Sequence, residues 1–253
     1  MISIIITHSP ERQPYLNRML LSLGNSLHSL DHEILVSSEG SKSFCRNELA
    51  KKAKGEILVF FDDDVEIREN TISELLMPFD TFKNVGVVGG VNVTFPDASS
   101  SEKLSGRLLS LPFVTFKSSS RYTPKGTPRE TDESEIQSCV MAVSKEAFVK
   151  AGGFPLDIIP AEENALVNSI QKLGYKVIYN PFAIVYHRRP KLYREYARTM
   201  FNYAYGRGLL IRKHKGSLKM FHKPSKDWLK LTLGVIVHYV SYISGLIWGW
   251  LRG

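Results

Sequence analysis

The sequence predicts an α/β fold in which helices flank a mostly parallel sheet. Short apolar runs of strand length alternate with segments of helical spacing through the first 60 residues. The 253 residues are enough for one large domain with a full core. A content of 43% hydrophobic and 23% charged residues is ordinary for a globular protein, which excludes the disordered and fibrous classes.

The first half of the chain supplies three apolar strands with two helices between them. The expected strands are residues 3–7, 33–36 and 57–61, and the expected helices are residues 15–30 and 42–54. Apolar runs without polar alternation fit strands that are buried on both faces. Gly55 is expected to end the second helix as a C-terminal cap. This order predicts parallel strands joined by crossover helices.

The second half continues the alternation after one long interruption. Residues 96–135 are rich in Ser, Thr, Pro and Lys and show little periodicity. We expect them to form a long, partly mobile excursion of the kind that often covers an active site. The other expected elements are strands at 85–91, 136–143, 176–179 and 183–186, and helices at 72–79, 145–151 and 161–173.

Three consecutive acids, Asp62, Asp63 and Asp64, follow directly on the apolar run 57–61. Ligands of open α/β folds bind at the carboxyl ends of the strands. Crowded carboxylates need a cation or hydrogen-bond donors to neutralise them, and Mg²⁺ and Mn²⁺ prefer oxygen ligands together with substrate phosphates. The alternative is a solvated acidic turn in which Asp64 caps the next helix. The strand that leads into the triplet favours a ligand site.

Further motifs follow in order on both sides of this triplet. They are Arg46-Asn47, Ala53-Lys54-Gly55-Glu56, Phe60-Phe61-Asp62-Asp63-Asp64, Met141-Ala142-Val143, Ala151-Gly152-Gly153-Phe154, Glu162-Glu163-Asn164-Ala165-Leu166, Gly174-Tyr175-Lys176 and Val185-Tyr186-His187. Together they resemble the motifs of family 2 glycosyltransferases over residues 1–190. The resemblance implies the GT-A fold, which has a Rossmann-like sheet. It also implies inverting transfer of one sugar from a nucleotide-sugar donor to an acceptor, with Mn²⁺ or Mg²⁺.

The resemblance assigns roles to the acidic triplet and to the histidine of the last motif. It makes Asp62 the contact to the donor ribose or base and Asp64 the metal ligand on the diphosphate. Asp63 is able to share either role, and Asp62 also stands as a candidate metal ligand. His187 is a candidate ligand of the metal or the diphosphate, and the alternative is a packed or surface histidine at a strand end.

Two segments correspond to the base-binding loops of the family. Thr7-His8-Ser9 resembles the loop that cups the base, although His8 and Ser9 replace its usual Tyr-Asn pair. After the second strand, Ser38 stands where the family usually has an Asp that binds uracil or ribose. Either Glu39 substitutes for that Asp or recognition of the base is altered.

The resemblance also points to a catalytic base. An inverting transfer needs a carboxylate that takes the proton of the acceptor hydroxyl. Glu163 occupies the position of the family's usual Asp, and Glu162 is the second candidate. The alternative is that both acids only stabilise the first turn of a helix, where the macrodipole also lowers their pKa. Arg46 is expected either near the donor phosphates or base, or as a solvated helix residue.

Charge is distributed unevenly along the chain. Residues 188–230 carry 13 Lys and Arg against two acids, whereas residues 1–187 carry 19 Lys and Arg against 23 acids. A basic tail on a mildly acidic body suggests a phosphate-bearing partner. We therefore divide the chain into a GT-A domain at 1–190, with a nucleotide-sugar half (1–95) and an acceptor half (96–190), and a basic, apolar-ended helical tail at 191–253.

The tail ends in an uncharged segment. Residues 231–251 contain no Asp, Glu, Lys or Arg, and their Tyr and Trp residues favour a membrane interface. An interfacial or re-entrant helix pair fits best, and a single span or a core helix are the alternatives. The preceding basic residues would meet anionic lipid on the cytoplasmic face. Interleaved aromatic and basic residues also occur in nucleic-acid-binding proteins, but the apolar run that follows favours a membrane.

Other features bear on the compartment and on competing functions. The two cysteines are far apart, which fits a reducing compartment, and the apolar start is expected to be a strand and not a signal peptide. The acceptor is expected to be a glycan, in particular a lipid-linked one. The absence of a Q..RW motif disfavours a processive synthase, and the absence of a Gly-rich loop disfavours a nucleotidyltransferase. A non-catalytic nucleotide-sugar-binding or membrane scaffold protein is the alternative, because Ser38 and Glu163 depart from the family pattern.

Overall fold

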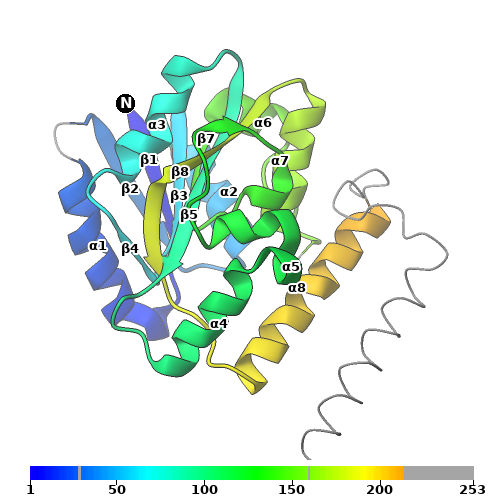
Figure 1. Cartoon of the computed structure of the whole chain (residues 1–253). Coiled ribbons are helices and arrows are strands. Elements are labelled where there is room, and N and C mark those ends of the chain that lie inside the picture. The colour runs from blue at the N-terminus through cyan, green and yellow to red at the C-terminus, as the bar shows by residue number, and fades with distance from the viewer. Residues whose placement is uncertain (28–29, 159, 214–253) are drawn as a thin grey trace, which may run out of the picture. The chain divides into compact units, whose positions relative to one another are not determined.

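The computed structural model describes residues 1–27, 30–158 and 160–213. In this part of the chain the strands are β1 Ile2–Thr7, β2 His32–Ser37, β3 Ile57–Asp62, β4 Val65–Ile67, β5 Val85–Thr94, β6 Arg129–Glu130, β7 Val140–Ser144 and β8 Lys176–His187. The helices are α1 Gln13–Leu27, α2 Lys42–Lys52, α3 Thr71–Thr81, α4 Ser100–Ser110, α5 Pro112–Thr115, α6 Lys145–Lys150, α7 Glu162–Lys172 and α8 Arg194–Lys213. Figure 1 shows the sheet at the centre with helices around it.

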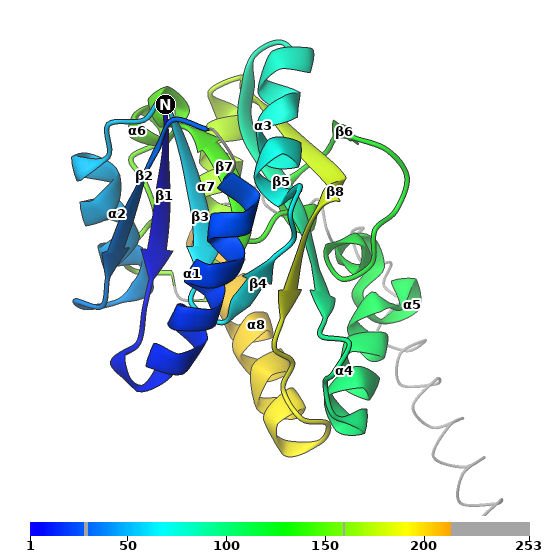
Figure 2. The same cartoon turned by 90° about the vertical axis from the view of Figure 1, so that its left-hand side faces the viewer.

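The strands form one mixed sheet in the order β2-β1-β3-β7-β5-β8-β4, with β6 paired to β8. Strand β1 is parallel to β2 and β3, as the alternation predicts, and β5 is parallel to β8. Strand β7 runs antiparallel to both β3 and β5, which the sequence does not predict. In Figure 2 the arrows of β1 and β8 point toward the end of the sheet at which α4 and α8 lie. The α/β fold class is confirmed.

Two cores cover the two faces of the sheet because strand residues alternate between the faces. Ile4, Ile6 and Phe61 pack on one side with the apolar residues of α1 and α3. Ile5 and Phe60 pack on the other side with the apolar residues of α2, α6 and α7. With both faces covered, the carboxyl ends of β1, β2 and β3 form the open edge of this part of the sheet.

The excursion at 96–135 differs from the irregular segment that its composition predicts. It contains α4, α5 and two 3₁₀ turns, Phe116–Arg121 and Glu133–Glu135. A capping box between Ser99 and Glu102 begins α4. The buried Glu135 carboxylate accepts hydrogen bonds from Ser120, Arg129 and Thr131. The polar residues that obscure any periodicity therefore form the network that orders this segment.

Two local predictions are wrong for identifiable reasons. Helix α2 ends at Lys52 with Ala53 as its cap, so Gly55 is not the cap. A Cβ at Gly55 would lie only 2.5 Å from the backbone nitrogen of Ser3, so glycine is required there by close packing on β1. The two short strands expected at 176–179 and 183–186 are one continuous strand, β8, whose pairing with β5 changes register between them.

A side-chain clamp joins α2 to the turn after α6. Asn47 donates from Nδ2 to the carbonyl oxygen of Phe154 at 2.8 Å and accepts at Oδ1 from its backbone nitrogen at 2.9 Å. Gly153 has a φ of +74°, and a Cβ there would lie 2.7 Å from Asn47 Oδ1. The two hydrogen bonds between Asn47 and Phe154 therefore require both the asparagine and Gly153.

We expect Asn47→Ala to lower the free energy of unfolding by about 2–3 kcal/mol, because both backbone groups of Phe154 lose their partner. Urea denaturation measures the change. The matched control is Asn17→Ala on α1, where the exposed side chain bonds only Gln13. We expect that control to stay within about 0.5 kcal/mol of wild type. Equal unfolding midpoints for the two variants would contradict the clamp.

Helix α8 packs against the start of α7. Leu210 is buried with Ile158, Ala161 and Ala165. A Cβ at Gly206 would lie 1.7 Å from the carbonyl oxygen of Pro160, so the helix approaches this loop more closely than another residue allows. Within the described residues, no helix is both long and apolar enough to cross a membrane. The predicted membrane segment 231–251 lies outside the described residues.

Candidate active site

The ends of the first three strands meet at one level of the sheet. Thr7 is in register with Ser37 on one side and with Asp62 on the other. The residues that follow these strands, including His8, Ser38 and Asp64, therefore leave the same edge. Ligands of α/β proteins bind at such an edge.

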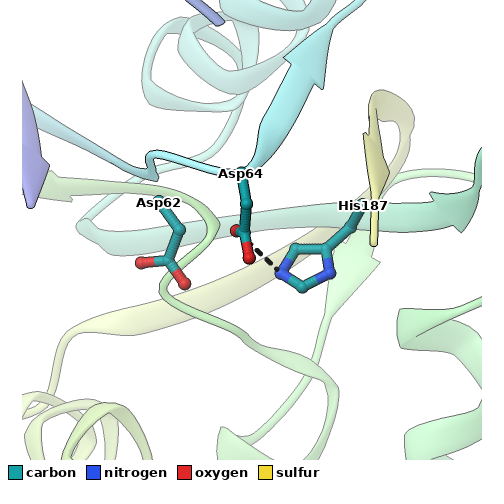
Figure 3. A group of neighbouring side chains, drawn as sticks. All are labelled: Asp62, Asp64 and His187. Atoms are coloured by element: carbon teal, nitrogen blue, oxygen red, sulfur yellow. Dashed lines mark ion pairs between the residues drawn. The ribbon is translucent and has the colours of Figure 1, made fainter. Parts of the chain in front are cut away.

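Asp62, Asp64 and His187 form the only group of metal-ligand type found among the described residues. Antiparallel pairing of β4 with β8 places His187 opposite Val65, the residue after Asp64. One ligand atom from each of the three side chains lies within 4.8 Å of the others. Figure 3 shows the three side chains converging on one region.

The donor set fits a divalent cation. Nδ1 of His187 lies 2.6 Å from the carbonyl oxygen of Arg188, so in the neutral ring it carries the proton. Nε2 then directs its lone pair toward Oδ1 of Asp64, 3.5 Å away. That carboxylate oxygen is buried and has no hydrogen-bond partner. Two acceptors that face each other in this way provide the ligands that a cation would use.

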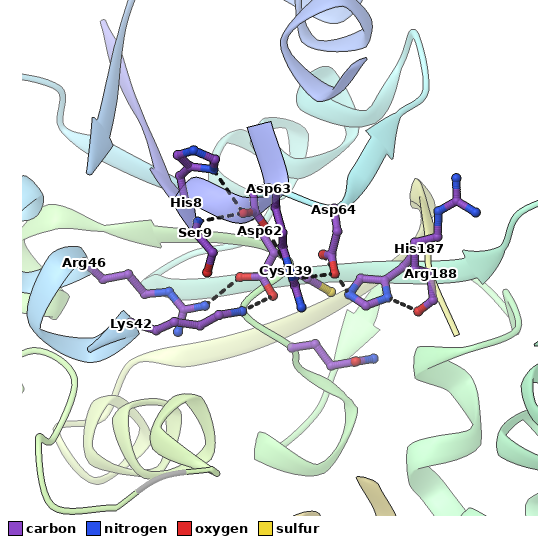
Figure 4. A network of polar contacts seen from close by, with 12 residues as sticks. His8, Ser9, Lys42, Arg46, Asp62, Asp63, Asp64, Cys139, His187 and Arg188 are labelled. Atoms are coloured by element: carbon purple, nitrogen blue, oxygen red, sulfur yellow. Dashed lines mark hydrogen bonds and ion pairs between the residues drawn. The ribbon is translucent and has the colours of Figure 1, made fainter. Parts of the chain in front are cut away.

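Two cations of α2 hold Asp62 in its charged form. Arg46 Nη2 donates to Oδ1 at 2.8 Å and Lys42 Nζ donates to Oδ2 at 3.1 Å, as Figure 4 shows. Burial alone would raise the pKa of Asp62, but the charges of Lys42 and Arg46 outweigh it and hold the pKa well below its usual range. Lys42 was not predicted as a site residue. Its spacing of four residues from Arg46, which puts both on one helix face, is the signal that identifies it.

Asp63 turns away from the other two acids and binds the loop after β1. It is 2% exposed and accepts hydrogen bonds from the backbone nitrogen of Ser9 at 2.9 Å and from Arg12 at 3.4 Å. Its other contact is Nδ1 of His8 at 3.2 Å. Arg12 also donates to Asp64 at 2.9 Å. Asp63 therefore fixes the predicted base-binding loop against the triplet.

Arg46 connects the triplet with α7. It is 1% exposed, so the interpretation of a solvated helix residue is wrong. Besides Asp62 it binds Glu162 through Nη1 at 3.0 Å, and its guanidinium lies 5.1 Å from the ring centroid of Phe154. The buried guanidinium of Arg46 thus compensates the negative charges of Asp62, at the end of β3, and Glu162, at the start of α7.

Unlike Glu162, Glu163 forms no ion pair among the described residues. Burial, and then the negative charge of Glu162, raise the pKa of the Glu163 carboxyl. The sequence led us to expect a lowered pKa at the start of a helix, so that expectation is wrong because burial outweighs the macrodipole. The preceding residue, Ala161, has a φ of +98°, a left-handed conformation that is unfavourable for alanine.

The remaining predicted donor contacts lie at the same edge. Thr7 is buried and its Oγ1 has no hydrogen-bond partner. Ser38 and Glu39 are exposed at the end of β2. Their proposed contacts to the nucleotide stay predictions.

Comparisons with known proteins agree with this geometry. Residues 42–151 match the profile of glycosyl transferase family 2. A mannosyltransferase from Pyrobaculum calidifontis in complex with GDP-Man and Mn²⁺ has a TM-score of 0.56 at 17% identity, over 83% of this chain and 64% of its own. TarS from S. aureus in complex with UDP has a TM-score of 0.52 at 14% identity, over 73% of this chain and 59% of its own. The curated proteins gave no match.

This chain therefore spans less than two thirds of each of these structures, and the structural likeness concerns the fold. The shared fold is GT-A, with its mixed sheet and flanking helices. The profile match includes α2 and the acidic triplet, whereas Glu163 and His187 lie outside the matched residues. Residues 42–151 of this chain are thus similar to glycosyl transferase family 2, and the described residues share the fold of the two solved glycosyltransferase structures.

Proposed function

We propose that the protein is an inverting glycosyltransferase that moves a single sugar from a nucleotide-sugar donor to an acceptor, with a divalent metal. The observation that carries the proposal is the convergence of Asp62, Asp64 and His187 at the carboxyl edge of the sheet. The solved structures with this fold include complexes with GDP-Man and Mn²⁺ and with UDP-GlcNAc, which supports a nucleotide-sugar donor.

The metal, Mn²⁺ or Mg²⁺, would be held by Asp64 and His187, with Asp62 as the third candidate ligand. When bound, it would neutralise the negative charge that develops on the leaving diphosphate. The unpartnered Oδ1 of Asp64 supports this assignment, because a buried carboxylate oxygen needs a partner.

On the donor side, Asp62 would accept hydrogen bonds from the ribose or base. Lys42 and Arg46 keep it charged and hold its carboxylate in place. The loop of Thr7, His8 and Ser9 would lie against the base, fixed there by Asp63. Ser38 and Glu39 would border the nucleotide from the end of β2, and Asp63 would act on the donor only through this loop.

On the acceptor side, Glu163 would act as the general base. Its carboxylate would take the proton of the acceptor hydroxyl as that oxygen attacks the anomeric carbon. The bond from this carbon to the diphosphate oxygen would break, and its electron pair would leave with the nucleoside diphosphate. Glu162 is the weaker candidate, because its carboxylate is already bound by Arg46.

The acceptor is proposed to be a glycan, in particular a lipid-linked one, reached from the cytoplasmic face of a membrane. The support comes from the start of the basic tail. Tyr193, Phe201 and Tyr205 are each more than half exposed, beside the exposed Arg194 and Arg198 on α8. Aromatic and basic side chains on one helix suit an anionic membrane surface.

Turnover of nucleotide sugars tests this function. Purified full-length protein with Mn²⁺ should release nucleoside diphosphate from at least one nucleotide sugar, faster when glycan or lipid-linked acceptors are added. Removal of Mn²⁺ by a chelator should stop the reaction. The alternative is a non-catalytic binding protein. Isothermal titration that shows donor binding, together with no turnover on a broad acceptor panel, would favour it.

A further inference from the structure

Two buried arginines lie beside the proposed acceptor side without a carboxylate partner. We call them, with the polar residues that join them, the arginine cluster: Asn92, Arg121, Tyr122, Gln137 and Arg189. Asn92 donates to Gln137 at 2.6 Å, and Gln137 donates to the carbonyl oxygen of Arg121 at 3.5 Å. Arg189 donates to the carbonyl oxygen of Asn92, and its guanidinium lies 5.1 Å from the ring centroid of Tyr122. The cluster is therefore one connected unit.

In the part of the chain that the structure describes, the guanidinium groups of this cluster are not directly paired with a carboxylate, although the charge of Arg121 acts on the carboxyl of Glu163. Arg121 and Arg189 are each 8% exposed, and neither takes part in any ion pair among the described residues. Arg121 donates to the backbone carbonyl of Glu133, and Arg189 bonds neutral oxygens of Asn92 and Thr94. Buried charges are costly unless an opposite charge compensates them.

An unpartnered donor of the cluster points to a missing acceptor. Nε of Arg121 is buried and has no hydrogen-bond partner. Buried polar atoms of this kind are uncommon and call for an explanation. A guanidinium also presents donors in a planar fork that matches phosphate and carboxylate groups.

The cluster is close in sequence to one residue of the metal-ligand group and acts electrostatically on the proposed base. Asn92 Nδ2 contacts Sγ of Cys139 at 3.2 Å, and Arg189 follows His187 by two residues. At the other end, the charge of Arg121 acts on the carboxyl of Glu163. The donor carboxylate Asp62 has its own cations, Lys42 and Arg46. An anion at the cluster would therefore lie on the acceptor side.

We propose that Arg121 and Arg189 form a subsite for an anionic group, a phosphate or carboxylate, of the acceptor. The assignment of this anion to the acceptor rests on the proposed function. The presence of an anion subsite rests only on the cluster itself. An acceptor that carries its negative charge next to the attacking hydroxyl would be placed by the two guanidinium groups and deprotonated by Glu163.

Binding of methyl phosphate to the full chain tests the subsite, both alone and with Mn²⁺ plus UDP or GDP. We expect wild type to bind it in both conditions, and Arg121→Gln and Arg189→Gln to bind it at least about tenfold more weakly. Arg121→Lys and Arg189→Lys keep the charge and should retain part of the affinity, which separates loss of the anion site from misfolding. The matched control is Arg18→Gln, which removes an exposed guanidinium paired with Glu66 and should change nothing.

Each other outcome has a definite meaning. Wild-type affinity in both glutamine variants, or no binding to wild type, would overturn the subsite. Loss of methyl phosphate binding when UDP or GDP is added would assign the anion to the donor diphosphate and overturn the acceptor assignment. Failure of both nucleotides to bind would count against the proposed function, while methyl phosphate alone would still report on the cluster.

Discussion

Asp64→Asn is expected to lower kcat/KM by about 1,000-fold or more, because metal assistance contributes several kcal/mol and each 1.36 kcal/mol is a factor of ten. The substitution keeps the size of the side chain but removes the charge that faces His187. The loss should therefore appear as lost metal affinity and not as a lost fold. Mn²⁺ binding by isothermal titration and turnover of the nucleotide sugar measure the two effects.

The control for this variant lies two residues away. Glu66 is part of β4, like the residue after Asp64, but its carboxylate binds the exposed Arg18 and not the site. We expect Glu66→Gln to keep kcat/KM within about twofold of wild type, because exposed ion pairs contribute little. Activity of Asp64→Asn within tenfold of this control would remove the role we assign to Asp64.

Glu163→Gln is expected to lower kcat by about 100- to 10,000-fold, the range for loss of a general base. Affinity for the nucleoside diphosphate with Mn²⁺ should stay at the wild-type value, because the residue lies on the acceptor side. Only the deprotonated carboxylate accepts a proton, so wild-type kcat should fall as the pH falls through the pKa of Glu163, which burial raises above its ordinary value. The variant should lack this limb of the pH profile.

Glu162→Gln separates the two candidate bases. It should keep the acidic limb, because Glu162 is bound by Arg46 and does not take the proton. Loss of the acidic limb in Glu162→Gln, with its retention in Glu163→Gln, would exchange the two roles.

Thermal stability gives a second test of the raised pKa of Glu163. A raised pKa means that the folded state favours protonated Glu163, so this contribution to stability is lost as the pH rises through the folded pKa. Above that pH, Glu163→Gln should therefore unfold at a higher temperature than wild type.

The sequence predicts the parts of the site that depend on strand ends. The apolar run before Asp62 indicates a buried strand, and three acids at its end indicate a ligand site. The ordered motifs extend this to His187, which lies more than 100 residues away, and β4 pairs with β8 to bring the two segments together. The apolar pattern and the order of the motifs are sufficient to predict these site residues, because each of them lies at or next to the end of a strand.

The parts that depend on tertiary burial do not follow from the sequence in the same way. Helical spacing cannot show that Arg46 is buried between Asp62 and Glu162, since its neighbours come from β3 and α7. The raised pKa of Glu163 likewise depends on what covers it. The helices of the excursion are hidden because a polar network around Glu135, and not an apolar stripe, orders that segment. Strand β7 is antiparallel to β5 because this ordered segment begins β7 at the same end of the sheet at which β5 ends.

Binding of nucleoside diphosphates with and without Mn²⁺ tests most directly whether the acidic edge holds a metal–diphosphate pair. Thermal unfolding of wild type and Asp64→Asn would be followed with UDP, GDP, CDP and ADP. At a ligand concentration 100 times Kd, the stabilisation should be about 2.7 kcal/mol. We predict a raised unfolding temperature for at least one nucleotide in wild type when Mn²⁺ is present, and a much smaller rise without Mn²⁺ or in Asp64→Asn. An equal rise without Mn²⁺, or in Asp64→Asn, would contradict the account.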